Sequence, residues 1–240
     1  ALIVAAQQGH AECVQLLINV KAIVNERNRE KSTALMESVR RGHTACAHIL
    51  IDAKADVDAR DSKLETALSK AVQKIHIDCV VMLIAAKADV NVSPPSMWGD
   101  TLVTWTARTG RHVCLDLLVD AKASVDVRNT SGKTALMVAA EHGHSACAQT
   151  LIQAKADLEA KQNNGYTALM VAVEHGRTAC TQTLIQAKAD LEAKQNDGYT
   201  ALMLVVEHGR SARAQTLIDA KADLEAKQND GYTALMVAVE

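Results

Sequence analysis

The chain has 240 residues, with 26 Lys plus Arg, 28 Asp plus Glu and a net charge of −2. This balance creates no global field that favours nucleic acid or anionic membranes, and no apolar run approaches the length that spans a bilayer. Apolar residues make up 48% of the chain, yet it holds no Phe, two Trp and three Tyr. Its apolar bulk is therefore Ala, Leu, Val and Ile, which suits thin, closely packed helices better than one thick core.

The sequence repeats with a period of 33 residues. Thr-Ala-Leu recurs with its Thr at 33, 66, 134, 167, 200 and 233, and Thr101 opens the variant Thr-Leu-Val. Every interval is 33 residues except the 35 between Thr66 and Thr101. We expect a single domain of seven repeats and the start of an eighth, at residues 1–33, 34–66, 67–101, 102–134, 135–167, 168–200, 201–233 and 234–240. Neither end carries a polar capping repeat, so we expect a fragment of a longer chain.

Each repeat is predicted to contain two helices followed by a turn-rich connection. Thr134 is the expected N-cap of a first helix over 135–142, and Gly143 supplies the left-handed turn that follows it. A second helix is expected over approximately 145–154, with its apolar residues on one side. Asn164-Gly165 marks a hairpin tip. Such a repeat cannot bury its apolar face alone, so neighbouring repeats must stack.

The repeat resembles the ankyrin family along all 240 residues. The family pattern is Gly-x-Thr-Pro-Leu-His-x-Ala-Ala-x-x-Gly-His, and residues 132–144 read Gly-Lys-Thr-Ala-Leu-Met-Val-Ala-Ala-Glu-His-Gly-His. Ala systematically replaces the family Pro, and Met usually replaces the family His that hydrogen-bonds one repeat to the next. The resemblance implies an all-α fold, an α-solenoid of stacked helix-turn-helix ankyrin repeats with short β-hairpin loops.

Lysine replaces a third family residue, the Gly that ends the second helix, at Lys21, Lys54, Lys87, Lys122, Lys155, Lys188 and Lys221. That Gly has positive φ in the family, a conformation that costs other residues on the order of 1 kcal/mol. A cation near the helix C-terminus recovers about 0.3–1 kcal/mol. We interpret these lysines as tolerated helix caps.

Six cysteines keep the same period: Cys13, Cys46, Cys79, Cys114, Cys147 and Cys180. Equivalent positions in stacked helices lie about 8–10 Å apart, whereas a disulfide requires Cα atoms within about 7 Å. The cysteines are therefore predicted to be small buried hydrophobes in a reducing, intracellular compartment, with the cytoplasm favoured. Arg213 breaks this series. We expect its side chain to snorkel to water, and a cysteine in its place to add roughly 1 kcal/mol of stability.

No residue pattern indicates catalysis. His144 and Cys147 have a spacing that could bind metal, but Arg177 replaces the His one repeat later while Cys180 remains. The other histidines recur with the repeat, as framework residues do. A phosphate-binding loop, a nucleophile elbow and a paired-carboxylate motif are all absent from the sequence. We predict no enzyme, no cofactor and no metal.

The candidate binding residues occupy the slots that line the concave face in the ankyrin family. These slots are basic in the N-terminal repeats, and acidic with tyrosines in the C-terminal ones. The one break in the period, at 92–100, brings two extra residues, a stiff Pro94-Pro95 pair and Trp98. The predicted partner-binding residues are Arg40, Arg41, Lys70, Lys74, Met97, Trp98, Trp105, Arg108, Glu141, Tyr166, Glu174 and Tyr199.

The resemblance implies a non-enzymatic protein-protein interaction module that binds a partner on its concave face. The alternative is a structural spacer or scaffold subunit within a larger assembly, in which packing edges matter more than the groove. Nucleic-acid binding through the basic slots is a third class, which a weak, salt-insensitive interaction would eliminate. We predict a protein partner and neither a nucleic-acid nor a membrane partner.

Overall fold

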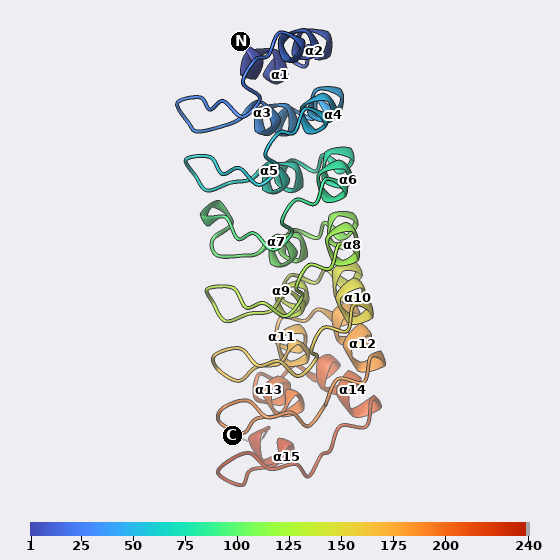
Figure 1. The fold of residues 1–240 in the computed structure, drawn as a ribbon. Coiled ribbons are helices and arrows are strands. Elements are labelled where there is room, and N and C mark those ends of the chain that lie inside the picture. The colour runs from blue at the N-terminus through green and yellow to red at the C-terminus, as the bar shows by residue number, and fades with distance from the viewer. Residues whose placement is uncertain (239–240) are drawn as a thin grey trace. The chain divides into compact units, whose positions relative to one another are not determined.

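The computed structural model describes residues 1–238, in which helices are the regular elements (Figure 1). The first helices of the repeats are α1 (Leu2–Gln8), α3 (Ala34–Arg41), α5 (Ala67–Lys74), α7 (Leu102–Thr109), α9 (Ala135–His142), α11 (Ala168–Glu174), α13 (Ala201–Glu207) and α15 (Ala234–Val237). The second helices are α2 (Ala11–Asn19), α4 (Thr44–Asp52), α6 (Ile77–Ala85), α8 (His112–Asp120), α10 (Ser145–Gln153), α12 (Thr178–Gln186) and α14 (Ser211–Asp219).

The connections between repeats are hairpin turns, and residues 1–238 contain no strand. In the repeat 67–101, a short 3-10 helix, η1 (Pro95–Met97), forms within the two-residue insertion. The final helix, α15, begins the eighth repeat predicted at 234–240. Residues 239 and 240 of that repeat lie outside the described part of the chain.

The helices gather into two compact units. The N-terminal unit comprises Ala1–Leu102 and Asp116–Ala123, and the C-terminal unit comprises Val103–Leu115 and the chain from Ser124 onward. In the N-terminal unit α1 packs on α3 and α3 on α5, while α2, α4 and α6 form a second row. In the C-terminal unit α9, α11, α13 and α15 form one row, and α10 packs on α12. Each unit is thus a stack of helix pairs.

Threonine determines where the first helices begin. The Thr33 hydroxyl accepts a hydrogen bond from the backbone N–H of Met36, at 3.3 Å, and Thr66, Thr134, Thr167 and Thr200 do the same in their repeats. This bond satisfies one of the N–H groups that a helix start leaves unpaired. The predicted N-caps are confirmed in these repeats.

The first helices carry the core. All residues of α9 from Ala135 to Ala140 are buried, and so are those of α3 from Ala34 to Val39. A helix buried on nearly all sides needs neighbours on both flanks. Alanine at several of these positions lets those neighbours approach closely. No single repeat therefore has a core of its own.

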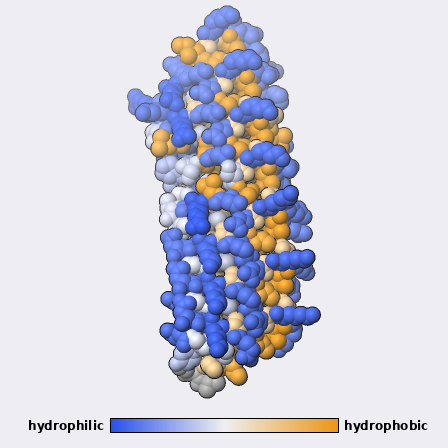
Figure 2. Space-filling view, turned by 60° about the horizontal axis from the view of Figure 1, so that its bottom comes forward, coloured by the Kyte–Doolittle hydropathy of each residue, from blue (hydrophilic) through white to orange (hydrophobic). Residues whose placement is uncertain are grey.

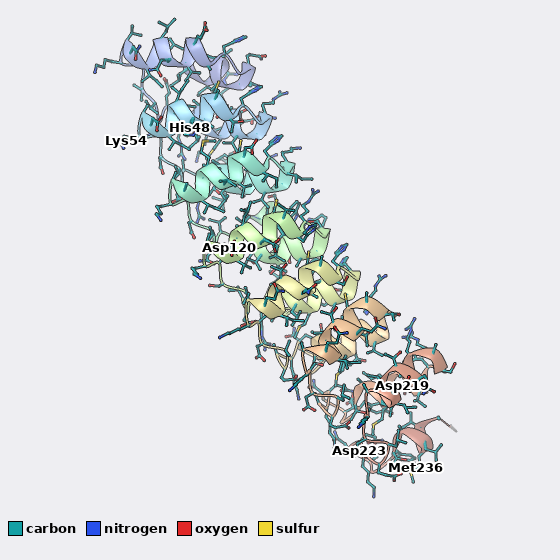
Figure 3. All side chains as sticks on the ribbon, turned by 90° about the vertical axis from the view of Figure 1, so that its right-hand side faces the viewer. His48, Lys54, Asp120, Asp219, Asp223 and Met236 are labelled. Carbon is teal, nitrogen blue, oxygen red and sulfur yellow. The ribbon has the colours of Figure 1, made fainter. Side chains whose placement is uncertain are left out.

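Lysine with positive φ follows every second helix, with φ between 63° and 68° at the seven positions named above. The backbone N–H of Lys54, which follows α4 (Figure 3), donates to the Ile51 carbonyl at 2.9 Å. The next N–H, of Ala55, donates to the Leu50 carbonyl at 2.9 Å. These bonds close the helix as a glycine cap would, so the left-handed lysine predicted from the sequence is confirmed.

A different residue replaces the missing family His as the link between repeats. The His43 Nε2 atom hydrogen-bonds the Gln7 carbonyl oxygen of the preceding repeat, at 3.2 Å. Arg177 uses its Nε to donate to the Glu141 carbonyl at 2.9 Å, and His144 makes the equivalent link in its own repeat. In these repeats the residue after the turn glycine therefore satisfies a carbonyl at the end of the preceding first helix.

The cysteines are free thiols, and those from Cys46 to Cys180 are buried. The Cys180 Sγ lies 3.8 Å from the Ala139 carbonyl oxygen of the preceding repeat. Burial, with a smaller contribution from the Asp78 charge, raises the pKa of Cys79 to about 11. Cys13, on α2, is exposed. The expectation that all six thiols are buried is therefore wrong for Cys13.

Arg213 has protein partners rather than water. Its NH1 donates to the carbonyl oxygens of Val173 and Glu174, at 3.2 and 2.6 Å, and Arg210 also donates to the Glu174 carbonyl. These carbonyls lie at the end of α11, where a helix has unpaired acceptors and partial negative charge. The snorkelling expectation is wrong, because the guanidinium caps the neighbouring helix.

The thiol exposure predicts two reactivity classes. In the folded chain we expect Cys13 to react rapidly with a thiol reagent and the other five cysteines only slowly, through opening of the stack. Time-resolved titration with a chromogenic disulfide measures both phases, and Cys13→Ser should remove the fast one. Intact mass under non-reducing conditions is the independent check. Loss of two protons per cysteine pair would contradict the free-thiol assignment.

The sequence predicts that a cysteine at position 213 would add stability, and the contacts of Arg213 predict the opposite. We expect Arg213→Cys to lower the free energy of unfolding by about 1 kcal/mol, because the bonds to the α11 carbonyls and the charge at that terminus are lost together. Arg213→Lys is the matched control and should retain part of the stability. Urea midpoints compare the three proteins. A midpoint above that of the parent chain for Arg213→Cys would show that these bonds contribute less than a buried thiol.

Candidate functional site

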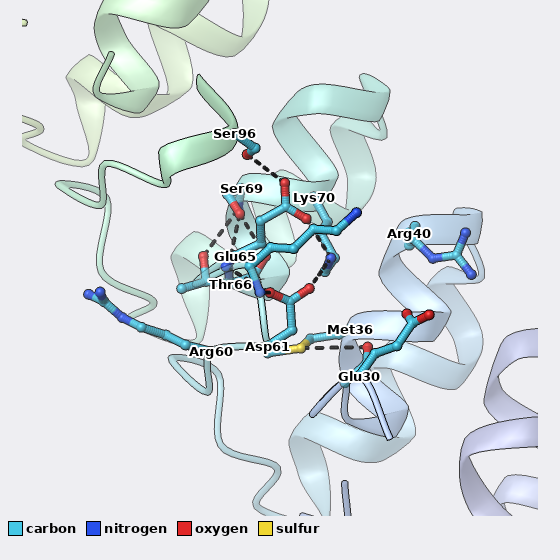
Figure 4. A network of polar contacts seen from close by, with 12 residues as sticks. Glu30, Met36, Arg40, Arg60, Asp61, Glu65, Thr66, Ser69, Lys70 and Ser96 are labelled. Carbon is cyan, nitrogen blue, oxygen red and sulfur yellow. Dashed lines mark hydrogen bonds and ion pairs between the residues drawn. The ribbon is translucent and has the colours of Figure 1, made fainter. Parts of the chain in front are cut away.

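A buried ion network ties a hairpin tip to α5 in the N-terminal unit (Figure 4). The Lys70 ammonium donates to Asp61 Oδ2 and to Glu65 Oε2, both at 2.7 Å. The second Asp61 oxygen accepts the backbone N–H groups of Lys63 and Glu65, at 2.8 and 3.0 Å. The three ionised side chains are at most 10% exposed. The tip 61–65 is therefore clamped at both ends to the helix that follows it.

Glu65 also holds the inserted segment. Its Oε1 accepts hydrogen bonds from Ser96 Oγ at 2.6 Å and from Gln73 Nε2 at 3.0 Å. Burial raises the pKa of this carboxyl, but the hydrogen bonds from Lys70, Ser96 and Gln73 outweigh burial and lower the pKa to about 2. Burial alone would lower the pKa of Lys70, yet its two carboxylate partners raise it. Both groups therefore stay ionised at neutral pH, and η1 is anchored to the preceding tip.

A second carboxylate of this face is satisfied on α3. Glu37 accepts the Ser32 hydroxyl at 2.7 Å and the Arg40 guanidinium at 2.5 Å. Burial raises the pKa of Glu37, and the bonds from Arg40 and Ser32 lower it overall. Arg40 is thus half-buried and engaged within its own helix. The acidic groups beneath this surface are neutralised from inside.

Two adjoining grooves run over this network. The first, of about 410 Å³, lies between α3, α5 and the tips, and its lining residues are Glu30, Glu37, Arg40, Asp61, Ser62, Lys63, Glu65, Lys70, Gln73 and Lys74. The second, also of about 410 Å³, lies between a tip and the insertion, lined by Ser62, Lys63, Leu64, Pro95 and Ser96. Because Ser62 and Lys63 line both, the grooves are continuous. We call them together the tip groove.

The tips of the N-terminal unit place side chains where the C-terminal repeats have glycine. Lys31 and Leu64 adopt φ of 58° and 59°, at positions that correspond to Gly132 and Gly165. Trp98 also has positive φ, 53°, directly after η1. Each such residue costs on the order of 1 kcal/mol relative to glycine. The same cost at the ends of the second helices recurs in every repeat, whereas at the tips it is limited to the N-terminal unit.

Six of the predicted binding residues belong to the N-terminal unit, and their exposure differs. Arg41 and Lys74 are exposed, and Trp98 is 80% exposed. Met97 is 1% exposed, because it ends η1 facing inward and the left-handed backbone at Trp98 turns the next side chain outward. Lys70 lies at the floor of the tip groove with its ammonium held by two carboxylates. The structure therefore removes Met97 and Lys70 from the surface that a partner can contact directly.

Trp105 and Arg108 lie on α7 in the C-terminal unit, and both are half-buried. The Arg111 guanidinium lies over the Trp105 ring, 5.1 Å from its centroid. This cation–π contact covers one face of the indole. Trp105 is thus already packed against a residue of its own unit.

The predicted acidic and tyrosine residues of the C-terminal unit are half-buried as well. Glu141 pairs with the Lys133 ammonium at 2.7 Å. Burial, followed by the charge of Glu174, raises the pKa of Tyr166. Tyr199 is half-buried in the next repeat. These side chains form a repeating but partly covered surface, less accessible than the tips of the N-terminal unit.

Sequence reasoning missed Asp61, Glu65 and Ser96, which build the network. Glu65 stands directly before a threonine cap, where the C-terminal repeats have a tyrosine such as Tyr166. An acidic residue at that position with Lys70 five residues later was the available signal. Glu65 and Lys70 both depart from the residues of the C-terminal repeats, and their opposite charges indicate an ion pair.

The described residues contain neither a metal-binding cluster nor a membrane-spanning helix. Within residues 1–238, no three His, Cys, Asp or Glu side chains converge as a metal site would require. No helix in the same span is long and apolar enough to cross a membrane.

Helix pairs that share threonine caps and repeat every 33 residues define a repeat protein in which each repeat is completed by its neighbours. The chain belongs to the ankyrin repeat family. The family model described as ankyrin repeats (3 copies) matches residues 2–94, 68–162, 103–195 and 169–240. Ankyrin repeat domains are typically protein-protein interaction modules and generally non-catalytic, and no enzyme family matches the chain.

Solved structures agree with this assignment. The ankyrin repeat domain of Bcl-3, described as a member of the IkappaB protein family, is 26% identical, with a TM-score of 0.81 over 88% of this chain and 95% of that one. An ankyrin repeat domain from Acinetobacter baumannii AYE is 26% identical, with a TM-score of 0.74 over 79% of this chain and 98% of that one. The search of curated proteins found no match. The all-α fold of stacked ankyrin helix pairs is therefore shown.

The ion network predicts a loss of stability in acid. Glu65 has a pKa of about 2 when folded, below its ordinary 4.5, so its contribution is complete above the unfolded pKa and is lost as the pH falls through the folded one. We expect Glu65→Gln to lower the free energy of unfolding at neutral pH by on the order of 2–3 kcal/mol, and to flatten the acid dependence. Urea unfolding across this pH range measures both effects.

Glu207→Gln, which neutralises an exposed carboxylate on α13, is the control and should leave the stability and its pH profile nearly unchanged. An acid slope for Glu65→Gln equal to that of the parent chain would contradict the role assigned to Glu65.

Proposed function

We propose that the chain is a non-enzymatic protein-interaction module that binds a partner protein on the face formed by its first helices and hairpin tips. The ankyrin family binds its partners on the corresponding face. Exposure of Trp98 is the observation that carries the proposal. Its indole is 80% exposed in a chain with only two Trp, three Tyr and no Phe.

The backbone that presents Trp98 is closed by several hydrogen bonds. The N–H groups of Met97 and Trp98 donate to the carbonyls of Pro94 and Pro95, both at 3.0 Å. Ser96 is tied to Glu65, and Met97 is buried beneath. A preorganised aromatic side chain loses little conformational entropy on binding. Tryptophan is also among the residues that most often dominate interface energies, so this geometry supports an anchor role.

One observation favours the alternative, a spacer or scaffold subunit in a larger assembly. Apolar side chains are exposed on the second helices, with Leu16 on α2 and Val81 on α6 among them. A groove of about 540 Å³ between α4 and α6 is lined in part by Ile51, Val81 and Met82. Figure 2 shows hydrophobic side chains, interrupted by hydrophilic ones, along the side on which Figure 1 draws the second helices. Under this alternative the second-helix side carries the main contact.

The remaining features fit an intracellular interaction module. Free thiols persist in reducing compartments such as the cytoplasm. The near-balanced charge gives no reason to assign a nucleic-acid or membrane partner.

Two substitutions distinguish the faces. The parent chain is used to capture partners, which are identified by mass spectrometry, and one purified partner is then titrated against the variants. We expect Trp98→Ala to weaken binding by about 2 kcal/mol or more, roughly 30-fold, with the melting temperature nearly unchanged. Val81→Ser on α6 is the matched control and should leave the affinity unchanged.

A loss of affinity for Val81→Ser but not for Trp98→Ala would replace the proposal with the scaffold alternative. An affinity change below about twofold for both variants would place the contact on neither surface.

A further inference from the structure

We infer that the tip groove of the N-terminal unit binds an extended acidic segment of the partner, with an apolar side chain of that segment covering Leu64 and Pro95. This inference rests on the proposed function and adds the chemistry of the ligand.

The carboxylates beneath the groove are already neutralised. Asp61 and Glu65 share the Lys70 ammonium, and Glu65 accepts two further hydrogen bonds. Glu37 is held by Arg40 and by a serine hydroxyl. A ligand in the groove therefore meets few uncompensated negative charges. Of the carboxylates that line it, Glu30 is the exposed one.

The cations of the groove remain available. Lys63 on the tip and Lys74 at the end of α5 are exposed lining residues, and within residues 1–238 neither ammonium is held in an ion pair. Lys31 on the preceding tip and Arg41 at the end of α3 add exposed positive charge. The floor fixes these positions, because the buried network orders the tip that carries Lys63. The accessible charge of the groove is positive, which complements carboxylates on a partner.

The apolar end of the groove sets the second requirement. Leu64 is 51% exposed, and Pro95, which lines the second groove with it, is exposed as well. Leu64 has this exposure at a φ of 59°, where the C-terminal repeats have glycine. A glycine at this position would remove the cost of the positive φ, and a polar residue would remove the exposed apolar area. Retaining leucine against both preferences indicates that its side chain is covered when a partner binds.

Nucleic acid is the other polyanion that could seek these cations, and the groove favours a peptide. The exposed carboxylate of Glu30 and the apolar pair Leu64 and Pro95 line the same continuous surface as Lys63. Glu30 would repel a phosphate backbone and an acidic peptide alike, so the apolar pair makes the difference, because only a peptide can cover it with an apolar side chain of its own. A peptide with alternating acidic and apolar side chains can satisfy both ends of the groove.

Fluorescence anisotropy with the full chain tests the inference. The probes are a labelled peptide in which Glu alternates with Leu, the same peptide with Gln for Glu, and a single-stranded oligonucleotide. We expect the Glu peptide to bind, the Gln peptide to bind at least tenfold more weakly, and the affinity to fall as salt rises. The double variant Lys63→Gln and Lys74→Gln should weaken binding of the Glu peptide by at least tenfold.

Matched variants separate this site from bulk charge. Lys54→Gln with Lys87→Gln removes the same charge from exposed lysines at the ends of second helices, and should leave the affinity within twofold. Glu30→Gln should tighten binding. Leu64→Gly should weaken it severalfold while raising the urea midpoint, because relief of the left-handed backbone and loss of the apolar contact act in opposite directions.

Equal binding of the Glu and Gln peptides, or equal losses in the two double-lysine variants, would overturn the inference. Tighter binding of the oligonucleotide through Lys63 and Lys74 would replace it with a nucleic-acid site. The proposed function is tested separately, by the affinity of the variants for the captured partner. Loss of partner affinity for Trp98→Ala without a loss for the Lys63 and Lys74 variant would retain the interaction module and reject the acidic-segment site.

Discussion

Burial of each first helix between the first helices of adjacent repeats is the interaction on which the structure depends. In the C-terminal unit, α11 is covered by α9 on one flank and by α13 on the other, and its residues from Ala168 to Val173 are buried. Because the hydrophobic contribution scales with apolar area removed from water, a repeat gains its stability only through such neighbours. The threonine caps fix where the first helices begin, and the lysines fix where the second helices end. Helices of equivalent bounds can then pack against one another from repeat to repeat.

The ion network of the N-terminal unit differs from this apolar packing between first helices. Lys70 and Glu37 occupy the first-helix slot that holds Val138 and Val171 in the C-terminal unit, and both valines are buried. Buried ion pairs often contribute no more to stability than apolar residues of similar size, because desolvation offsets the attraction. Their benefit here is geometric. Hydrogen bonds to Asp61, Glu65 and Ser96 fix a tip and an inserted helix that valine would leave untethered.

How much the sequence predicts follows from the same contrast. Features that recur in every repeat, such as the Thr134 cap or the positive φ of Lys155, follow from periodicity and local backbone chemistry. Periodicity does not predict contacts between residues at different positions of the repeat. Lys70 was assigned to the surface because its slot faces the tips, and only the fold shows the two carboxylates that bury it. Arg213 likewise found its partners in the carbonyls at the end of the preceding first helix.

The distribution of unfavourable backbone conformations gives the last step. In a stack whose stability is nearly a sum of nearest-neighbour terms, a local cost is borne by one repeat and its contacts rather than by the whole chain. Glycine at 132, 165, 198 and 231 shows that every C-terminal tip avoids that cost. Lys31, Leu64 and Trp98 incur it, on consecutive tips of one unit, and all three are exposed. The positive-φ lysines that end the second helices recur in every repeat, whereas at the tips the cost is limited to the N-terminal unit. There it lies above a base that buried charges hold in place, an arrangement that favours a surface for an external ligand.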